Sequence, residues 1–420
     1  MSSSHSNLRP VKGTRDLLPA DTRRFGFLYE HFKNETELAG FGEIATPILE
    51  NIEVFTHSLG DTSDVVTKQM YAFKDNNGDS LVLRPEGTAG VARAFINEGM
   101  AQEVPVKLSY YGPMFRYERP QKGRYRQFFQ MGIELLGAQK SQADIEVIAC
   151  AHQLLTKIGL ISRVKLQINS IGDEVSRNNY REALLKYLRA HFAELSLESQ
   201  NRIEKNPLRI LDSKDPKDRE ILKSAPLFRD SLNEESRQFF DEICAGLRSL
   251  KIEFVIDDYL VRGFDYYCHT VFEFTTEDLG SQNAVLSGGR YDGLIEAFGG
   301  PKTPGVGWAA GVDRLALMIE EPKMKHRPVA VIPMNESFEA RALELCIELR
   351  NSGIASDLAF SGNMGKRMKR ANKLGAKFAF ILGEEEMARE KFLIKNMDNG
   401  TQSEISHSDW LNAFRQLEAL

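Results

Sequence analysis

Residues 111–137 read YGPMFRYERPQKGRYRQFFQMGIELLG, two alternating runs joined by a basic connection. In the second run the odd positions are apolar, whereas the even positions hold Gln130, Gly132 and Glu134. This period of two is typical of a β-strand. A glycine inside a strand often marks a place where a ligand approaches the backbone. The second run therefore predicts a strand with one face toward a core and a polar face suited to a ligand.

The first run, Met114–Glu118, places Arg116 and Glu118 on one face. The connection Arg119–Arg126 is rich in arginine and lysine and contains a proline and a glycine, which favour turns. Together the runs predict a long antiparallel hairpin with a basic tip and a polar inner face. The alternative is a surface hairpin with a solvated face, because half-exposed strands normally alternate in this way.

The order FRYER, basic connection, RQFFQ resembles motif 2 of the class II aminoacyl-tRNA synthetases and, in its details, that of the histidyl-tRNA synthetases. The resemblance implies that Arg116 and Arg124 bind ATP, with Arg116 on the α-phosphate. It implies that Gln130 completes a clamp for the ammonium group of histidine. It also places Arg119 and Gln121 near the acceptor stem of a tRNA.

The composition is that of an ordinary globular protein: of 420 residues, 42% are hydrophobic and 27% charged, enough for two or three domains. No apolar run approaches the roughly 20 residues of a membrane span, and the N-terminus lacks an apolar signal region, so we expect a cytoplasmic protein without a membrane partner. The four cysteines are far apart and have no zinc spacing. Because the net charge is −5, contacts with nucleic acid would require local basic patches.

The N-terminal part predicts a helix from Ala20 to about Ala39, then a short β-like run ending at Pro47 and a helical stretch. Taken alone, this is an ordinary strand-to-helix connection. It resembles motif 1 of the family, with Pro47 at the signature proline. The resemblance implies a homodimer.

Residues Leu81–Thr88 read LVLRPEGT, which predicts a short strand followed by a helix from Ala89 to Asn97. Thr88 suits the cap of that helix. A carboxylate beside a hydroxyl at a strand end also suits an ammonium group, which offers three donors. In histidyl-tRNA synthetases this segment holds the amino group of histidine, which implies that role for Glu86, Gly87 and Thr88.

The segment Arg262–Tyr267, RGFDYY, is a dense polar and aromatic cluster that would also suit a packed turn. It resembles the segment most diagnostic of the histidyl-tRNA synthetases. There the arginine contacts the α-phosphate and the carboxylate, partly in place of a metal ion. The resemblance implies that Tyr266 and Tyr267 line the histidine pocket, and that Glu134 and Tyr267 together read the two imidazole nitrogens.

Residues Gly305–Arg314, GVGWAAGVDR, predict a strand with one face almost free of side chains, leading into a helix from Val312 to Ile319. Such a face admits a flat group, either a nucleotide base or a closely packed helix. Arg314 lies in the first helical turn, where a basic residue is unfavourable and a phosphate partner would explain it. The segment resembles motif 3, which implies that Arg314 binds the γ-phosphate of ATP.

The earlier sequence SGGRYD, residues 287–292, contains Arg290 and Tyr291. Either residue could face the ligand or have a structural role.

We expect four regions: catalytic core 1–170, helical insertion 171–250, catalytic core 251–325 and a C-terminal α/β domain 326–420. In the last region strands and helices alternate, which predicts parallel pairing. Its predicted helix from Met364 to Leu374 is basic, which suits a solvated face. The region resembles an anticodon-binding domain, and the resemblance assigns RNA contacts to four residues: Lys366, Arg367, Lys369 and Arg370.

Taken together, the motifs predict an α+β class II synthetase core on an antiparallel sheet, with a helical insertion and a C-terminal anticodon-binding domain. The implied activity is that of a histidine–tRNA ligase in protein biosynthesis: ATP and L-histidine form histidyl-adenylate, and histidine passes to the 3′ end of tRNA(His). Arg116 and Arg262 are the predicted catalytic residues. We expect Mg²⁺ with the ATP phosphates and no metal site built by the protein alone.

Two other functions are alternatives to this one. A non-catalytic, synthetase-like regulatory subunit of histidine biosynthesis would tend to lose RG-x-DYY and the anticodon domain, and both are present. An amide ligase that forms an adenylate without RNA would not need the ERPQKGRYR connection or a basic C-terminal patch.

Overall fold

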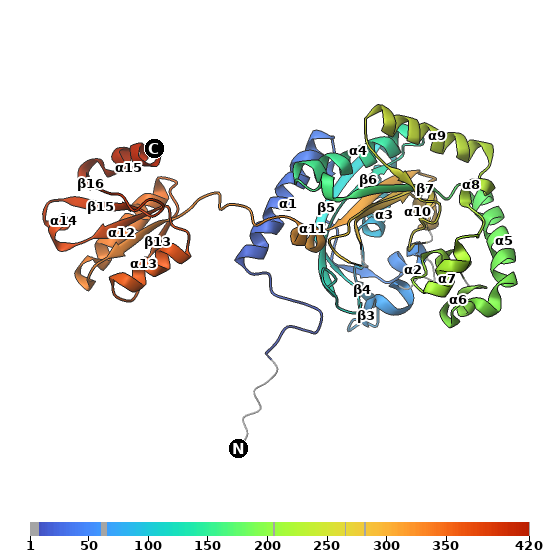
Figure 1. Ribbon diagram of the computed structural model, residues 1–420, viewed down its shortest axis with the longest axis horizontal. Helices are drawn as coiled ribbons and strands as arrows, with labels where there is room; N and C mark the ends of the chain where they lie inside the picture. Colours follow the sequence, from blue (N-terminus) through green and yellow to red (C-terminus); the bar gives the residue numbers. More distant parts are fainter. Residues whose placement is uncertain (1–7, 60–64, 205, 265, 281–282, 420) are drawn as a thin grey trace, which may run out of the picture. The chain divides into compact units, whose positions relative to one another are not determined.

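The computed structural model describes residues 8–59, 65–204, 206–264, 266–280 and 283–419 (Figure 1). The chain divides into two compact units, Met1–Pro322 and Lys323–Leu420. Each unit has its own sheet and its own hydrophobic core. Among the described residues, none of the helices is long and apolar enough to cross a membrane.

An eight-stranded, mainly antiparallel sheet forms the centre of the larger unit. Only its outermost pairs, β1 with β5 and β7 with β8, are parallel. In spatial order its strands are β1 (Gly42–Glu43), β5 (Val106–Phe115), β6 (Gln127–Leu136), β11 (Gly305–Gly311), β10 (Ala284–Arg290), β9 (Cys268–Thr275), β7 (Lys165–Ser170) and β8 (Val255–Ile256).

The hairpin of β5 and β6 confirms the predicted antiparallel pair, with Gly112 opposite Gln130. The first strand ends earlier than expected, at Phe115. Arg116 and Glu118 therefore lie in the connection between the strands. The backbone turns here, and the Glu118 N–H donates a hydrogen bond to the Arg116 carbonyl at 2.8 Å. We call residues 116–126 the hairpin loop.

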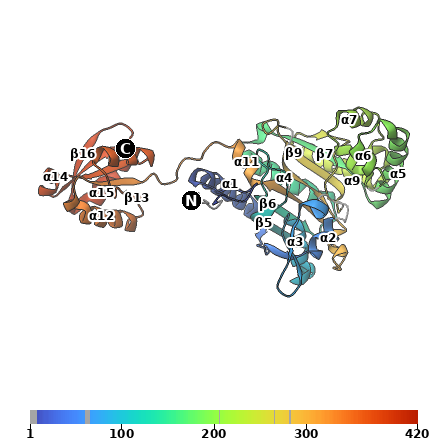
Figure 2. The same cartoon turned by 90° about the horizontal axis from the view of Figure 1, so that it is seen from below.

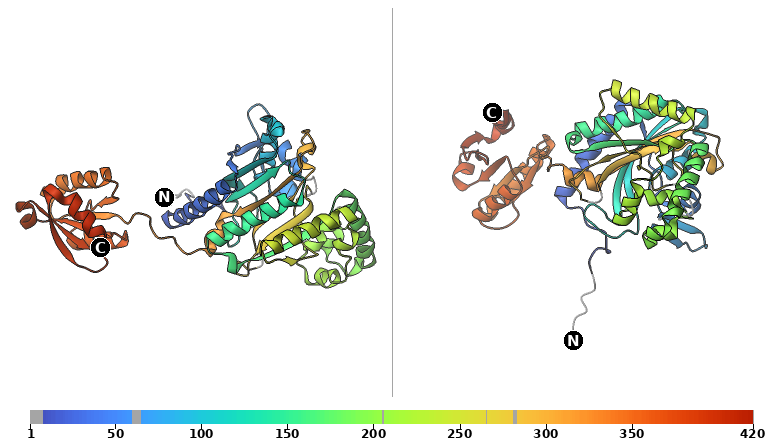
Figure 3. Two further views of the ribbon diagram at one scale, coloured as in Figure 1. Left: turned by 90° about the horizontal axis from the view of Figure 1, so that it is seen from above. Right: turned by 45° about the vertical axis from the view of Figure 1, so that its right-hand side comes forward.

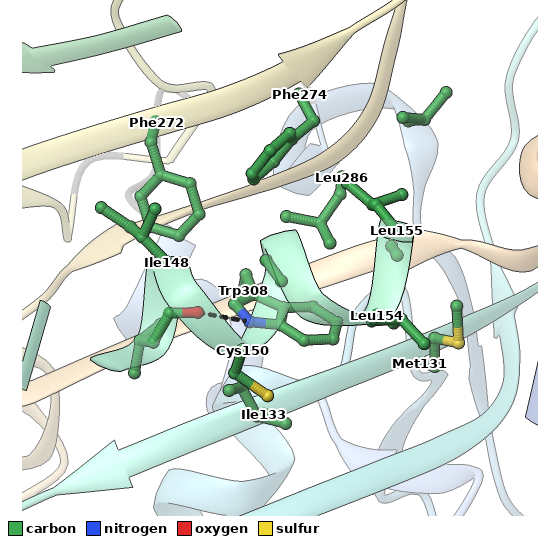
Figure 4. Close-up of a cluster of buried hydrophobic side chains, with 14 of the residues drawn as sticks. Met131, Ile133, Ile148, Cys150, Leu154, Leu155, Phe272, Phe274, Leu286 and Trp308 are labelled. Atoms are coloured by element: carbon green, nitrogen blue, oxygen red, sulfur yellow. Dashed lines mark hydrogen bonds between the residues drawn. The ribbon is translucent and has the colours of Figure 1, made fainter. Parts of the chain in front are cut away.

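One face of the sheet is covered by four helices that share a core with it (Figures 1 and 2): α1 (Pro19–Leu38), α4 (Ser141–Lys157), α9 (Glu234–Ser249) and α11 (Val312–Met318). The predicted apolar face of β6 lies in this core, where Met131 and Ile133 are fully buried. Trp308 of β11 lies beside them and donates a hydrogen bond to the Val147 carbonyl at 3.0 Å (Figure 4). The polar face of β6 is consequently turned toward the opposite side of the sheet.

A group of helices lies apart from these four (Figure 3), in the region predicted as an insertion: α5 (Glu174–Ala190), α6 (Leu197–Arg202), α7 (Pro216–Leu222) and α8 (Phe228–Ser231). Tyr180 and Phe228 stack at its centre, with ring centroids 3.7 Å apart. Helix α9 falls within the predicted range 171–250, yet Ile243 and Leu247 belong to the core of the large sheet.

A small antiparallel sheet precedes the hairpin and consists of β2 (Leu49–Asn51), β4 (Ser80–Leu83) and β3 (Tyr71–Lys74). As predicted, β4 ends before Arg84, and a helix follows after Gly87. The remaining helices of this unit are α2 (Glu53–Leu59), α3 (Thr88–Asn97) and α10 (Leu294–Ala297), with short turns η1 (Val65–Gln69), η2 (Met100–Gln102), η3 (Ile161–Arg163), η4 (Phe192–Glu194) and η5 (Pro207–Asp212).

The C-terminal unit has a five-stranded sheet in the order β13 (Ser356–Leu358), β12 (Val329–Pro333), β14 (Phe378–Leu382), β15 (Lys391–Asn396) and β16 (Gln402–Ser406). The predicted parallel pairing is confirmed for β12 with β13 and with β14. The last two strands add antiparallel pairs that the alternation did not predict. The helices here are α12 (Glu339–Asn351), α13 (Met364–Lys373), α14 (Glu384–Ala388) and α15 (Trp410–Ala419), with turns η6 (Glu336–Phe338) and η7 (His407–Asp409).

Candidate active site

A pocket of about 390 Å³ opens on the polar face of the large sheet. The hairpin, the start of α3, residues 262–264 and 266–267, and strands β10 and β11 contribute to its wall. The wall contains nine of the residues predicted from sequence: Glu86, Thr88, Arg116, Arg124, Gln130, Arg262, Tyr266, Tyr267 and Arg314. The fold therefore brings together segments that are far apart in the chain.

At one end of the pocket, Glu86 caps helix α3. Its carboxylate accepts hydrogen bonds from the N–H groups of Thr88 at 2.7 Å and Ala89 at 2.8 Å. Burial raises the pKa of Glu86, although these two hydrogen bonds oppose the rise. The capping role that Thr88 could have filled thus belongs to Glu86, and the Thr88 hydroxyl is directed elsewhere.

The Thr88 hydroxyl donates to Glu134 Oε1 at 2.7 Å. The other oxygen of Glu134 accepts from the Tyr291 hydroxyl. Glu134 is only 1% exposed and lies behind the pocket wall, and burial raises its pKa to about 8. At neutral pH much of this carboxyl group is therefore protonated, so a hydroxyl-lined end of the pocket has a neutral acid behind it.

Gln130 completes this end of the pocket. Its Oε1 is buried and meets no hydrogen-bond donor among the described residues. A buried carbonyl oxygen without a donor carries a desolvation cost that a ligand donor would remove. Gln130 Oε1, the Thr88 hydroxyl oxygen and the Glu86 carboxylate are three potential acceptors on the pocket wall.

An aromatic group stands beside these acceptors. The rings of Tyr266 and Tyr267 are 4.6 Å apart, and the Tyr291 ring lies 5.7 Å from the first and 6.4 Å from the second. Burial raises the pKa of all three phenols, so they remain neutral hydrogen-bonding groups. Tyr291, which sequence left as either structural or ligand-facing, lies on the pocket wall.

The pocket wall also carries cationic side chains, one of which, Arg116, lies close to Glu86. Arg116 donates from Nε to the Pro85 carbonyl at 2.8 Å, and its guanidinium lies 5.3 Å from the centre of the Phe128 ring. Burial lowers the pKa of Arg116, and also that of Arg314, where nearby Arg124 adds to the effect. These lowered pKa values show that carboxylates in the protein do not fully compensate the two buried cations.

Arg116 lies 3.9 Å from Glu118, and two other predicted arginines also have carboxylate partners. Arg124 pairs with Glu118 at 2.9 Å, and Arg262 pairs with Glu273 of β9. Arg262 Nε is buried and meets no acceptor among the described residues. Each guanidinium thus lies on the wall with part of its donor set engaged by the protein.

Strand β11 has one face almost free of side chains. In the first half of the strand this face packs against other side chains of the protein, and in the second half it borders the pocket. A Cβ atom at Gly305 would lie 2.3 Å from the Tyr291 ring, and one at Gly307 would lie 1.9 Å from Glu134 Oε2. Ala309 and Gly311 lie on the pocket wall. The first glycines therefore make room for the acid and phenol behind the pocket, and the later positions are open to a flat ligand.

Besides Glu134, four residues considered from the sequence lie off the pocket wall. A Cβ atom at Gly87 would lie 2.2 Å from the Tyr110 ring, so this glycine makes room for a buried tyrosine. Arg119 and Gln121 are exposed in the hairpin loop. Arg290 is structural: it is fully buried and forms an ion pair with Asp144.

In the C-terminal unit, Lys366, Lys369 and Arg370 are exposed on α13, and Arg370 pairs with Asp357 at 3.0 Å. Arg367 is different, because only 6% of it is exposed. Its guanidinium donates to the carbonyls of Gly362 and Pro333 and pairs with Glu339. The expected exposed phosphate contact at Arg367 is therefore corrected to a structural role.

Comparison with known proteins agrees with this geometry. The histidyl-tRNA synthetase family model matches residues 13–315, and an anticodon-binding-domain model matches residues 328–417. The chain belongs to the histidyl-tRNA synthetase family. A histidine–tRNA ligase of Rhodospirillum rubrum is 54% identical over 95% of this chain and 96% of the relative, and one of Gluconobacter oxydans is 46% identical over 96% and 97%.

A solved structure of apo histidyl-tRNA synthetase from S. aureus is also similar, with a TM-score of 0.79 and 34% identity. The alignment covers 97% of this chain and 99% of that one. The predictions of the class II fold, the anticodon-binding domain and the aminoacyl-tRNA ligase class are thereby confirmed.

Sequence reasoning missed several residues of this histidyl-tRNA synthetase family site. Tyr110 lies between Gly87 and Gly132 with its hydroxyl buried, and those two glycines were the available signal. Tyr291 was visible in SGGRYD without a way to choose its role. Glu273, the partner of Arg262, had no signal, because a lone acid in an apolar strand does not reveal what it faces.

Proposed function

We propose that this chain activates L-histidine with ATP and transfers it to the 3′ end of tRNA(His). The observation that carries the proposal is that one pocket combines two kinds of group: hydrogen-bond acceptors with a neutral acid behind them, and arginines whose charge the nearby carboxylates offset only in part. Such a pocket complements a cationic amino acid head at one end and a polyphosphate at the other.

The ammonium group of histidine would bind Glu86, Thr88 and Gln130. Its three N–H donors match the three acceptors found there. The Gln130 oxygen supports this role most directly, since it is buried without a donor among the described residues. Gly87 would act indirectly, by admitting the Tyr110 ring behind the clamp.

The imidazole would bind between Tyr266, Tyr267 and the Glu134–Tyr291 pair. A phenol and a carboxyl group can serve one imidazole nitrogen each as donor or acceptor. Because Glu134 lies behind the wall and both its oxygens accept hydroxyl hydrogen bonds, the imidazole would contact the Tyr291 oxygen, and Glu134 would act through the Tyr291 hydroxyl. An apolar side chain would leave these groups unpaired, which disfavours it strongly.

For activation, a histidine carboxylate oxygen would attack the α-phosphorus of ATP in line. A phosphorus–oxygen bond forms, the bond to pyrophosphate breaks, and pyrophosphate leaves with its electron pair. The carboxylate is already a nucleophile, so the chain's contribution is positioning and charge stabilisation. Arg116 and Arg262 would hold the α-phosphate as catalytic residues, while Arg124 and Arg314 would hold the outer phosphates through forked guanidinium donors.

Mg²⁺ would enter with the ATP phosphates, which supply most of its oxygen ligands. Glu118 is a carboxylate on the pocket wall and suits such an ion. Bound Mg²⁺ would neutralise phosphate charge. Within the described residues, no group of three or more His, Cys, Asp or Glu side chains is arranged to hold a metal ion.

In the second step, the terminal ribose hydroxyl of tRNA would attack the adenylate carbonyl, and AMP would leave. Arg119 and Gln121 are exposed in the hairpin loop and would contact the acceptor stem. Lys366, Lys369 and Arg370 would contact RNA in the C-terminal unit. We further propose that the protein is cytoplasmic and forms a homodimer, and the resemblance to motif 1 is the basis for the homodimer. We also propose that its domains are residues 1–170, 171–250, 251–325 and 326–420.

The test is amino-acid-dependent exchange of pyrophosphate into ATP, measured separately with each of the common amino acids. Exchange with histidine alone, followed by charging of a tRNA(His) transcript, is the expected result. Exchange without charging would favour the amide ligase. A folded protein with no exchange would favour the regulatory subunit.

A further inference from the structure

The N-terminal segment, residues 11–17, lies against the hairpin loop. The Arg126 N–H donates to the Gly13 carbonyl at 2.7 Å. Gly13 has φ +89°, and a Cβ atom there would lie 2.8 Å from the Arg126 side chain and 3.1 Å from Pro120. The backbone of the segment thus packs directly on the end of the loop, which explains the glycine in VKGTRDL.

From this segment, Arg15 reaches across to helix α11. Its guanidinium donates to Asp313 Oδ1 at 3.1 Å and pairs with Asp21 at 3.3 Å. The guanidinium carbon also lies 4.7 Å from the centre of the Tyr125 ring, within the range of a cation–π contact. One side chain therefore joins α1, α11 and the hairpin loop.

Asp313 extends this connection to β6. The side chain of Asp313 is 5% exposed, and its Oδ2 accepts the Phe129 N–H at 2.9 Å. Tyr125, Phe129 and Asp313 all lie on the pocket wall, as does the next residue, Arg314. The carboxylate thus fixes the start of the helix that carries Arg314 to the strand that leaves the hairpin loop.

The loop also packs on α11 directly. A Cβ atom at Gly123 would lie 3.3 Å from Arg314 Cγ, so the loop leaves room for the arginine that faces the pocket. Arg124 follows in the same loop and, like Arg314, lies on the pocket wall. Two like charges are held near each other here before any anion arrives, and the contacts that hold the loop against α11 must offset the free-energy cost of their repulsion.

We propose that Arg15 is a positioning residue for the nucleotide end of the pocket: it ties the hairpin loop to α11 and so holds Arg124 and Arg314 ready for the phosphates. The proposal rests on the assignment of that end to ATP. Arg15 itself lies outside the pocket wall and acts through Asp313 and Tyr125. Removing it would leave a largely buried carboxylate with the Phe129 N–H as its remaining hydrogen bond in the described structure.

The experiment compares Arg15→Ala and Arg15→Lys with a matched control, Arg23→Ala. Arg23 also pairs with an acid 298 positions along the chain, Glu321, but Arg23 is half-buried, Glu321 is exposed, and neither lies on the pocket wall. Calorimetric titration with ATP gives the Kd of each variant without requiring turnover. Hydrogen exchange of the Arg126 and Phe129 amides reports whether the loop and strand are still held.

For Arg15→Ala, we expect the Kd for ATP to rise about tenfold and the two amides to exchange faster, because displaced groups bind and react poorly. In pyrophosphate exchange, the KM for ATP should rise while the KM for histidine changes less than about twofold, since uniform damage would move both. Lysine, with a single point of charge, should give an intermediate Kd. Arg23→Ala should resemble the parent chain.

An unchanged Kd for ATP in folded Arg15→Ala would overturn the proposal, as would an equal rise in both KM values. If Arg15→Ala does not fold, Arg15→Lys provides the test. An Arg15→Lys variant with the same Kd for ATP and the same Tm as the parent chain would also overturn the proposal. A parent chain that binds ATP yet shows no histidine-dependent exchange would defeat the proposed function instead, and the Kd comparison would still test Arg15.

Discussion

In the pocket region the carboxyl groups of Glu86 and Glu134 have raised pKa values, whereas the guanidinium groups of Arg116 and Arg314 have lowered ones. Burial is the largest cause in all four cases, and it disfavours the charged form of each group. Burial thus outweighs the protein's own counter-charges, including the attraction between Glu86 and Arg116. A ligand that is cationic at one end and anionic at the other would supply the missing charges.

Arg290 shows the opposite case. It is fully buried, whereas Arg116 and Arg314 are partly buried, and the carboxylate of Asp144 raises its pKa against the effect of burial. A buried guanidinium that a partner holds away from the pocket wall is structural, whereas arginines on the pocket wall, including Arg262 with its partner Glu273, mark a binding site. This distinction separates Arg290 and Arg367 from Arg116 and Arg314.

The largest effect is expected at the anionic-ligand end. Arg314→Ala should lower kcat/KM for pyrophosphate exchange about 10³-fold, because a preorganised donor aimed at developing charge contributes about 3–4 kcal/mol. Steady-state exchange kinetics would measure it. A loss below about tenfold would mean that Arg314 does not contact the reacting phosphates.

A smaller effect is expected at the ammonium end. Glu86→Gln keeps the shape but removes the negative charge, so the KM for histidine should rise about 100-fold while the KM for ATP stays nearly constant. Both values come from the same exchange assay. A parallel rise in the KM for ATP would show that the two ends do not act separately.

The third prediction concerns pH and Glu134. Its pKa lies at about 8 in the folded chain, above the ordinary value of 4.5. The folded state therefore holds the proton more tightly, and Glu134 contributes stability at low pH that is lost as pH rises from about 4.5 through about 8. Glu134→Gln should remove a slope of at most about 1.4 kcal/mol per pH unit from the free energy of unfolding.

Denaturant unfolding at several pH values would measure this slope in the parent chain and the variant. A parent slope that survives in Glu134→Gln would show that other groups cause it.

The smallest effect is expected in the C-terminal unit. Lys366→Ala should reduce the slope of log K against log salt for tRNA binding by about 1, because one phosphate contact is lost. Lys157→Ala, an exposed lysine of the catalytic unit, is the control. An unchanged slope would place Lys366 outside the RNA contact.

Comparison of the sequence predictions with the structure shows where local patterns suffice. The alternation around Gln130 and Glu134 predicted β6, its buried face and its polar face, because strand period depends only on neighbouring residues. Helix α3 and the bare face of β11 followed from equally local patterns. The class II motifs then placed these elements in one pocket by resemblance.

Tertiary partners were beyond those patterns. In the sequence, Arg367 is one of several basic residues on a predicted helix. In the structure it is buried, and its guanidinium binds the carbonyls of Gly362 and Pro333 and the Glu339 carboxylate. Glu273 facing Arg262 and Asp313 facing Arg15 are likewise pairings between distant segments. No periodicity specifies which charged residues meet across a sheet, so their roles required the structure.

The most direct test of the charge division is inhibition of histidine-dependent exchange by two analogues. Histidinol keeps the ammonium and imidazole groups but has an alcohol in place of the carboxylate, whereas imidazolepropionate lacks the ammonium group. We predict that histidinol competes with histidine and that imidazolepropionate binds at least about 100-fold more weakly, since it leaves the acceptors of Glu86, Thr88 and Gln130 unpaired. Equal inhibition by the two analogues would contradict the assignment of that end to the ammonium group.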